Sequence, residues 1–167
     1  MKLPVRSSFL IAFLSIIAVI LLFTFGCSDP CKETVCENGG TCIDGTCNCP
    51  AGYQGDSCNH ETRSFYYGTY NVHDVCTVTG VSDYTVNISE VPDQLTKVYI
   101  ANFANSFANN VIASVNGNQI TIAVQSPDND GRLVSGSGTL SQNTIHMSYS
   151  ISGSTGTNTC DESTWVK

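Results

Sequence analysis

The sequence predicts a mainly β protein in which a small disulfide-rich module precedes an antiparallel β-domain of about eight strands. Three observations predict this class. Six of the nine cysteines fall within residues 31–58, apolar and polar residues alternate from residue 65 onward, and helix signals are scarce. Alternation with a period of two is typical of half-buried antiparallel strands. The expected divisions are a signal sequence at 1–26, a tether at 27–30, the cysteine-rich module at 31–58, a linker at 59–64 and the β-domain at 65–167.

The N-terminal segment has the composition of a targeting signal. Lys2 and Arg6 precede an uncharged run, residues 7–26, that is rich in Leu, Ile, Phe and Val. This run is longer than the usual apolar core of a signal peptide, about 7–15 residues, and close to the minimum of about 17 for a spanning helix. Two alternatives follow: a signal sequence cleaved before Cys27, or an uncleaved N-terminal anchor. Both place the rest of the chain outside the cytoplasm.

The residues Thr24-Phe25-Gly26-Cys27 resemble the lipobox of bacterial lipoproteins, whose cysteine becomes lipidated. The last two residues match that pattern, and the first two depart from it. The resemblance implies a lipidated, palmitate-bearing Cys27 and a location in the cell envelope, facing the exterior. The alternative is a single-pass anchor with an extracellular C-terminus. Lipidation also accounts for the one cysteine that an even set of disulfides leaves over.

The cysteine-rich module depends on crosslinks, because a segment this short cannot bury enough apolar area to fold alone. Its spacing is C-x4-C-x5-C-x4-C-x-C-x8-C, with the run C-P-A-G-Y-Q-G at residues 49–55. Six cysteines permit many pairings, and spacing alone does not choose among them. An exported chain meets oxidising conditions, which favour disulfides over metal–thiolate bonds.

This spacing and the run at 49–55 resemble an EGF-like domain. The family pairs first with third, second with fourth and fifth with sixth cysteine, which implies the disulfides Cys31–Cys42, Cys36–Cys47 and Cys49–Cys58. The acidic lead-in of calcium-binding members is absent before the first cysteine, and Ser57 stands where receptor-activating members carry Arg. The resemblance therefore implies a rigid spacer or docking module without a metal.

Alternation predicts the strands of the β-domain, with turn signals such as Asn116-Gly117 between them. Short connections favour an up-and-down meander that closes into a barrel. Cys76 and Cys160 lie in the first and last strands, which are antiparallel neighbours in a closed barrel, so we predict a Cys76–Cys160 disulfide. A β-sandwich, which also permits this bond, is the alternative. The expected strands are 65–78, 82–89, 96–101, 110–115, 119–125, 132–140, 144–151 and 159–166.

Gly68-Thr69-Tyr70 resembles the G-x-W of the first strand of lipocalin-like barrels. The order of an EGF-like module and a β-domain that begins G-T-Y is also similar to surface lipoproteins of the Bacteroidetes group. A barrel of eight strands is filled by side chains or holds one small ligand, and the short strands favour a filled core. If a ligand is held, the residues expected to line its site are Tyr84, Val86, Ile88, Ile120, Ile122, Val124, Met147 and Tyr149.

Candidate catalytic groups are few. His73 and Asp74 are adjacent, and adjacent strand residues point to opposite faces, so they cannot act as a pair. Asp128-x-Asp130-Gly131 resembles the start of a calcium loop, but the twelfth position is Thr139, where an acidic ligand is needed, so a hairpin turn is favoured. We predict that the protein is not an enzyme and that it holds no metal or cofactor.

Charge excludes one class of partner. The net charge is −7, and removal of Lys2 and Arg6 leaves five basic against 14 acidic residues, a net charge of −9. Such a chain is unsuited to binding nucleic acid. The predicted function is that of a membrane-tethered cell-surface lipoprotein, a non-enzymatic binding or adhesion module with a protein or glycan partner. The alternative is a lipocalin-like carrier of a small apolar ligand.

Overall fold

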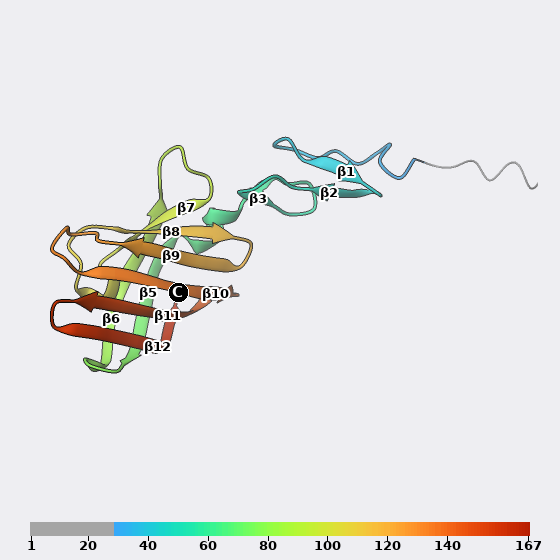
Figure 1. Ribbon diagram of the computed structural model, residues 1–167. Coiled ribbons are helices and arrows are strands. Elements are labelled where there is room, and N and C mark those ends of the chain that lie inside the picture. Colours follow the sequence, from blue (N-terminus) through green and yellow to red (C-terminus); the bar gives the residue numbers. More distant parts are fainter. Residues whose placement is uncertain (1–28) are drawn as a thin grey trace, which may run out of the picture.

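The computed structural model describes residues 29–167, which form a cysteine-rich module and a β-barrel (Figure 1). The predicted signal sequence, the membrane-anchor alternative and the lipidation of Cys27 lie outside the described residues. Within residues 29–167, no helix has the length and apolar character needed to span a membrane.

The cysteine-rich module consists of two small hairpins. Strand β1 (Thr41–Ile43) pairs with β2 (Thr46–Asn48), and β3 (Tyr53–Gln54) pairs with β4 (His60–Glu61). Its disulfides are the predicted ones: Cys31–Cys42, Cys36–Cys47 and Cys49–Cys58. Between residues 29 and 58 only Gly52 and Cys58 are buried, so crosslinks and not a core hold this module together.

Eight antiparallel strands form the predicted closed barrel, and the alternative β-sandwich is wrong. Each strand pairs with its neighbour in sequence, and the last strand pairs with the first. Cys76 and Cys160 are register partners and form the predicted disulfide. The strands are β5 (Gly68–Cys76), β6 (Gly80–Glu90), β7 (Lys97–Ala101), β8 (Val111–Asn116), β9 (Gln119–Gln125), β10 (Leu133–Ser141), β11 (Thr144–Gly153) and β12 (Gly156–Val166).

The segment before the barrel differs from the prediction of a linker at 59–64 followed by a strand from residue 65. Residues 60–61 form β4, and Thr62–Tyr66 forms a 3₁₀-helix, η1, which packs against β6, β7 and β8. The Arg63 guanidinium donates to the Val91 carbonyl at 2.7 Å, and the Tyr66 hydroxyl donates to the Gly117 carbonyl at 3.1 Å. Aromatic residues occupy three consecutive positions here, so alternation could not mark where the strand begins. The η1 helix therefore closes one end of the barrel.

Side chains fill the middle of the barrel. Phe103, from the short helix η2 (Phe103–Asn105), packs against Tyr149 and Trp165, with ring centroids 4.7 Å and 5.8 Å apart. Glycines on the neighbouring strand β10 make room for two side chains of β11: Gly136 is the register partner of Tyr149, and Gly138 is the register partner of Met147. Six of the eight residues predicted to line a ligand site belong to this packed core: Val86, Ile88, Ile120, Ile122, Met147 and Tyr149.

The prediction that Val124 faces the interior is wrong, because its side chain is 71% exposed. Ile122 pairs with Gly136 and Gln125 pairs with Val134, so two residues of β9 oppose one residue of β10. Such a bulge shifts the alternation by one residue and turns the next side chain outward. The backbone pairing of β9 with β8 ends at Thr121 and Ser114. Beyond it, the side-chain amide of Gln125 donates to the Ile112 carbonyl at 2.7 Å and accepts from the Ile112 amide at 2.9 Å.

Replacement of Gly138 by Ala should destabilise the barrel. A Cβ atom there would collide with the Met147 sulfur and lie 2.6 Å from the His146 carbonyl oxygen. Overpacking of this kind costs about 1–3 kcal/mol. Gly153→Ala is the matched control, because a Cβ there meets only Arg132 at an ordinary 3.5 Å, and its expected effect is within about 0.5 kcal/mol. Urea unfolding measures both, and equal stabilities of the two variants would contradict the packing argument.

Candidate functional site

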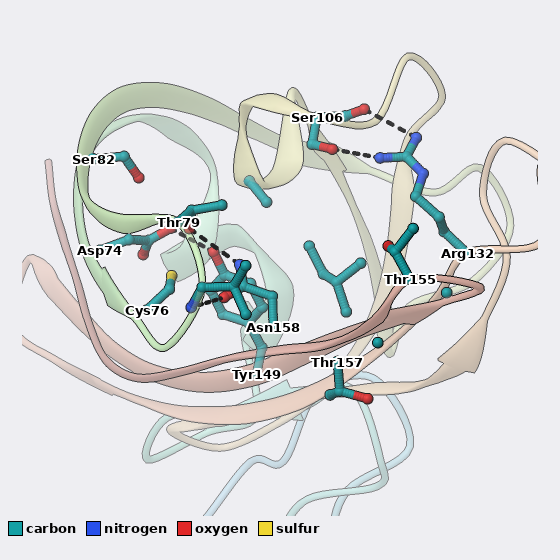
Figure 2. A pocket seen from close by; sticks show the side chains of 15 residues that line it. Asp74, Cys76, Thr79, Ser82, Ser106, Arg132, Tyr149, Thr155, Thr157 and Asn158 are labelled. Atoms are coloured by element: carbon teal, nitrogen blue, oxygen red, sulfur yellow. Dashed lines mark hydrogen bonds between the residues drawn. The ribbon is translucent and has the colours of Figure 1, made fainter.

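The two ends of the barrel differ. Alternate connections of an up-and-down barrel lie at the same end, so the loops at 91–96, 117–118 and 142–143 share the end that η1 closes. The loops at 77–79, 102–110, 126–132 and 154–155 surround the opposite, far end. A cavity of about 320 Å³ lies at the far end, between β5, β6, β11, β12 and η2 (Figure 2). The module and the cavity are therefore at opposite ends of the barrel.

A buried carboxylate forms part of the cavity wall. Asp74, on β5, is 1% exposed. Its Oδ2 atom accepts hydrogen bonds from the hydroxyls of Tyr84, at 2.6 Å, and Tyr149, and its Oδ1 atom accepts from the Ser163 hydroxyl. The Trp165 indole N–H donates to the Ser163 oxygen at 2.7 Å. These five residues form one network across β5, β6, β11 and β12.

A second bulge assembles this network. Cys160 pairs with Cys76, and Glu162 pairs with Val75, so β12 carries one extra residue between them. Asp161 and Glu162 are consecutive exposed residues, and Cys160 and Ser163 on either side of them are both buried. Strict alternation would place one of these two side chains outside. The bulge directs both toward β5, one as a disulfide partner and one as a hydrogen-bond donor.

Both tyrosines in the network stay protonated over the physiological range. Burial is the largest cause that raises the pKa of Tyr84 and of Tyr149 well above the ordinary phenol value, and the hydrogen bond to Asp74 raises both further. Neutral hydroxyls therefore surround the carboxylate. Among the ion pairs of residues 29–167, none involves Asp74.

The rim of the far-end cavity carries a cluster of side chains centred on Arg132. Its guanidinium donates to Asp130 at 2.7 Å and to Asp128 at 3.1 Å, lies 4.5 Å from the centroid of the Phe107 ring, and also donates to Ser106. Hydrogen bonds from the backbone amides of residues 109 and 108 lower the pKa of Asp128. The carboxylates of the predicted hairpin turn are thus occupied by protein donors, and the cluster braces the loop at 126–132 against the loop at 102–110.

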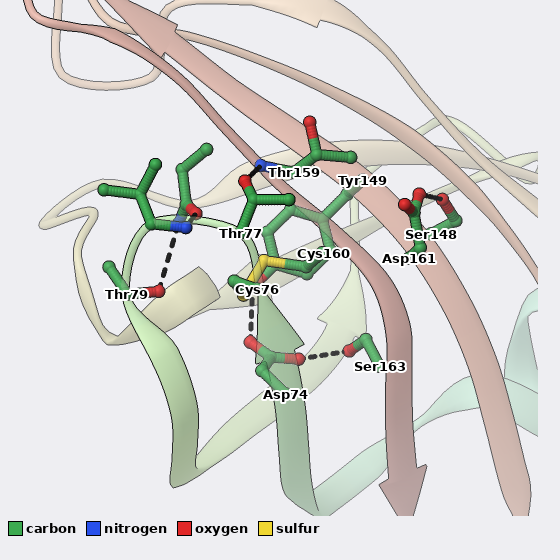
Figure 3. Close-up of a disulfide and its surroundings, with 12 residues drawn as sticks. Asp74, Cys76, Thr77, Thr79, Ser148, Tyr149, Thr159, Cys160, Asp161 and Ser163 are labelled. Atoms are coloured by element: carbon green, nitrogen blue, oxygen red, sulfur yellow. Dashed lines mark hydrogen bonds between the residues drawn. A yellow bond between two sulfur atoms is a disulfide. The ribbon is translucent and has the colours of Figure 1, made fainter.

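The Cys76–Cys160 disulfide lies beside Asp74 (Figure 3). One carboxylate oxygen and the two sulfur atoms lie within 4.8 Å of one another, a grouping that could hold a metal ion if the sulfurs were free. A thiolate is the form of cysteine that binds metals, and these sulfurs are bonded to each other. Cys76 also contributes to the cavity wall.

The candidate residues from the sequence divide into three groups. Tyr84 and Tyr149 meet at Asp74, and Tyr149 lines the cavity; five others are packed in the core, and Val124 is outside. The sequence interpretation considered Asp74 only as a partner of His73, and it did not single out Ser163. A signal for Asp74 was present, because it shares its strand face with Tyr70, Val72 and Cys76, and a carboxylate on an apolar face demands partners. No signal marked Ser163, because its direction depends on the bulge.

His73 faces the outer surface of the barrel. Its Nδ1 atom is 2.7 Å from Asp83 Oδ1, and the two residues share a shallow outer groove with Thr164. Both side chains are more than half exposed. In the part of the chain that the structure describes, no hydroxyl or thiol is hydrogen-bonded to this imidazole. The pair has the geometry of a base and its orienting carboxylate, but lacks a nucleophile, and exposed pairs of this kind are common and weak.

Comparison with known proteins gives one local similarity. No family model matches the chain. An alignment over 41 residues, which covers 22% of this chain, is 46% identical to Neural-cadherin of Drosophila melanogaster. The chain spans about 1% of the length of that relative. A match of this extent carries no information on the activity of the whole protein.

The Ser163→Ala variant should lose stability through the buried network. It removes a donor from Asp74 and leaves the Trp165 N–H without its acceptor, and unsatisfied buried groups cost about 1–3 kcal/mol each. Ser148→Ala, which removes an exposed hydroxyl from the neighbouring strand, is the control. Chemical unfolding followed by Trp165 emission measures both variants. A loss no larger than that of the control would show that the network contributes nothing to stability.

Proposed function

We propose that this protein is a membrane-tethered cell-surface lipoprotein whose β-barrel is a non-enzymatic binding module. The single observation that carries the proposal is the asymmetry of the barrel. One end is closed by η1 and joined to the cysteine-rich module, and the other holds the cavity and its buried carboxylate. A chain tethered at residue 27 would present that cavity away from the membrane.

The cysteine-rich module suits the role of an EGF-like spacer in this proposal. Its three disulfides follow the pairing of that family, and the local similarity to Neural-cadherin is consistent with such a module. Contacts at the junction favour a stiff connection. Arg63 is bonded to the 91–96 loop, and a Cβ at Gly52 would lie 2.9 Å from the Leu95 Cβ, so the two parts are in close contact.

The size of the cavity sets what it can bind. Ligand sites for small molecules range from about 300 to 1,000 Å³, and this cavity lies at the lower end of that range. It accommodates one small molecule, or one exposed group of a protein or glycan partner. The lipocalin-like carriage of an apolar ligand has the closed eight-stranded barrel in its favour, but the packed interior supports it less well than a site at the barrel end.

The position of His73 favours binding without catalysis. His73 and Asp83 lie in a groove on the outer face, whereas Asp74 and the cavity lie inside the barrel. The imidazole therefore cannot act as a base on a molecule held beside Asp74. The remaining groups at the cavity are neutral hydroxyls, a disulfide and the braced Arg132, which position a ligand but do not attack it.

Chemical-shift mapping with a library of small fragments of mixed charge tests the binding module. The protein, with module and barrel intact, should show shift changes grouped around Cys76, Tyr149 and residues 156–158 at the far end. A Ser82→Phe variant, which fills the cavity, should lose them. Shift changes that are confined to the outer faces, or that survive in the filled variant, would rule out the cavity as the binding site.

The tether has its own test, which is the mass of the N-terminal peptide of protein extracted from its own membranes. A diacylglyceryl group on Cys27 is the expected result, because the lipobox-like residues end there. An intact Met1 and an unmodified Cys27 would mean an N-terminal membrane anchor, and the lipoprotein proposal would fail. The binding proposal would stand in either case, since both anchors leave the barrel outside.

A further inference from the structure

The carboxylate of Asp74 is buried without a countercharge. It is 1% exposed, and each of its three hydrogen-bond donors is a neutral hydroxyl. An ionised carboxylate has room for about four donors, so one acceptor position is left over. Burial of a charge away from water is unfavourable unless an opposite charge compensates it. A carboxylate in this state, at the wall of a cavity, is an incomplete site for a cation.

The groups around the cavity are negatively charged overall, as Asp74 is. Arg132, the one cation at the rim, is paired with both Asp128 and Asp130, so this cluster carries an excess negative charge. Together with Asp74 the far end is negative, and the whole chain carries a net charge of −7. An anionic ligand would meet repulsion here, and a neutral ligand would leave Asp74 uncompensated.

The other wall residues indicate an organic cation and not a metal ion. Calcium takes about six to eight oxygen ligands, and magnesium demands near-octahedral oxygen geometry. Here one carboxylate already bonded to three hydroxyls faces an apolar wall that includes Val78, Ile151 and the Cys76–Cys160 disulfide. This wall suits the carbon skeleton of a ligand, and the carboxylate suits its charged end.

We infer that the far-end cavity recognises a primary ammonium group attached to a short apolar body, with the ammonium hydrogen-bonded to Asp74. The inference rests on the proposed function, because it names the chemistry of the same site. The ammonium fills the remaining acceptor position of the carboxylate and compensates its charge. The apolar body lies against Val78, Ile151 and the disulfide.

Three probes of similar shape and different charge test whether the cavity recognises the ammonium group. They are 2-phenylethylamine, 2-phenylethanol and phenylacetate. Titration calorimetry on the intact protein measures affinity, and the emission of Trp165, the single tryptophan, reports on the network that ends at Asp74. We expect the amine to bind at least about tenfold more tightly than the alcohol, since charge-assisted hydrogen bonds are the stronger kind, and phenylacetate not to bind. Equal affinities for amine and alcohol would overturn the inference.

A matched pair of variants locates the charge that matters. Asp74→Asn and Asp83→Asn make the same chemical change on neighbouring strands, one at the cavity and one on the outer face. Amine affinity should fall at least about tenfold in the first variant and stay unchanged in the second. Equal losses in both variants would assign the effect to the overall field of the protein and would overturn the inference, as would retention of affinity in Asp74→Asn.

Substitution of Ser82 tests the same inference if Asp74→Asn fails to fold. Ser82 is the register partner of Asp74 on β6 and lines the same cavity. Ser82→Lys places a tethered ammonium opposite the carboxylate, so it should raise the Tm and abolish amine binding. Ser82→Gln has a similar size without the charge, and should leave the Tm below that of the lysine variant. Identical behaviour of the two variants would overturn the inference.

A further comparison distinguishes two sources of the ammonium group, a protein partner and a free small molecule. A short peptide with a free N-terminus and its acetylated form are compared with 2-phenylethylamine. Tighter binding of the free peptide assigns the ammonium to a protein partner, and tighter binding of the small amine assigns it to a free metabolite. Fragments that map to the cavity without any preference for amines would leave the proposed function intact and refute this inference alone.

Discussion

The pairing of β5 with β12 is the contact on which the rest of the barrel depends. It joins Cys76 to Cys160 across a separation of 84 residues, so it carries the largest loop-closure entropy of any strand pair in the barrel. A disulfide there restricts the unfolded chain, which is typically worth about 2–4 kcal/mol. The hydrogen bond between Asp74 and Ser163 crosses the same seam. The strand pair that closes the barrel therefore also contributes two residues of the candidate site, Asp74 and Ser163.

The site lies where the regular strand pattern is interrupted. A perfect ladder alternates its side chains and cannot direct Cys160 and Ser163 to the same face at this spacing. The bulge at residues 161–162 allows this, and the bulge in β9 turns Val124 outward. Beyond the last β8–β9 backbone pair, the Gln125 side chain is hydrogen-bonded to the Ile112 backbone. Bulges bend strands and redirect side chains, and they are common beside functional sites.

The end of the barrel next to the module is built for stability. Tyr66 and Tyr70 are fully buried there, and burial raises the pKa of each to about 12. Lys167, at the end of the chain, donates to the Phe65 carbonyl at 3.2 Å and lies 5.4 Å from the Tyr70 ring. Gly68 permits this crossing, because a Cβ there would lie 2.9 Å from the Lys167 side chain. One end is thus filled, and the other holds the polar network and the cavity.

The class of the fold, the strand count, the turns and all four disulfides of the described residues could be predicted from the sequence, because alternation, turn residues and cysteine spacing are local or family-wide signals. The sequence also predicted that the interior would be filled. The directions of Val124 and Ser163 depend on the three-dimensional fold, because a one-residue bulge reverses the phase of a strand and leaves no mark in composition. The tertiary structure also decided which end of the barrel is closed, since η1 depends on contacts with Val91 and Gly117, far away in the chain. Asp74 became a candidate site residue only when three strands brought their hydroxyls to it.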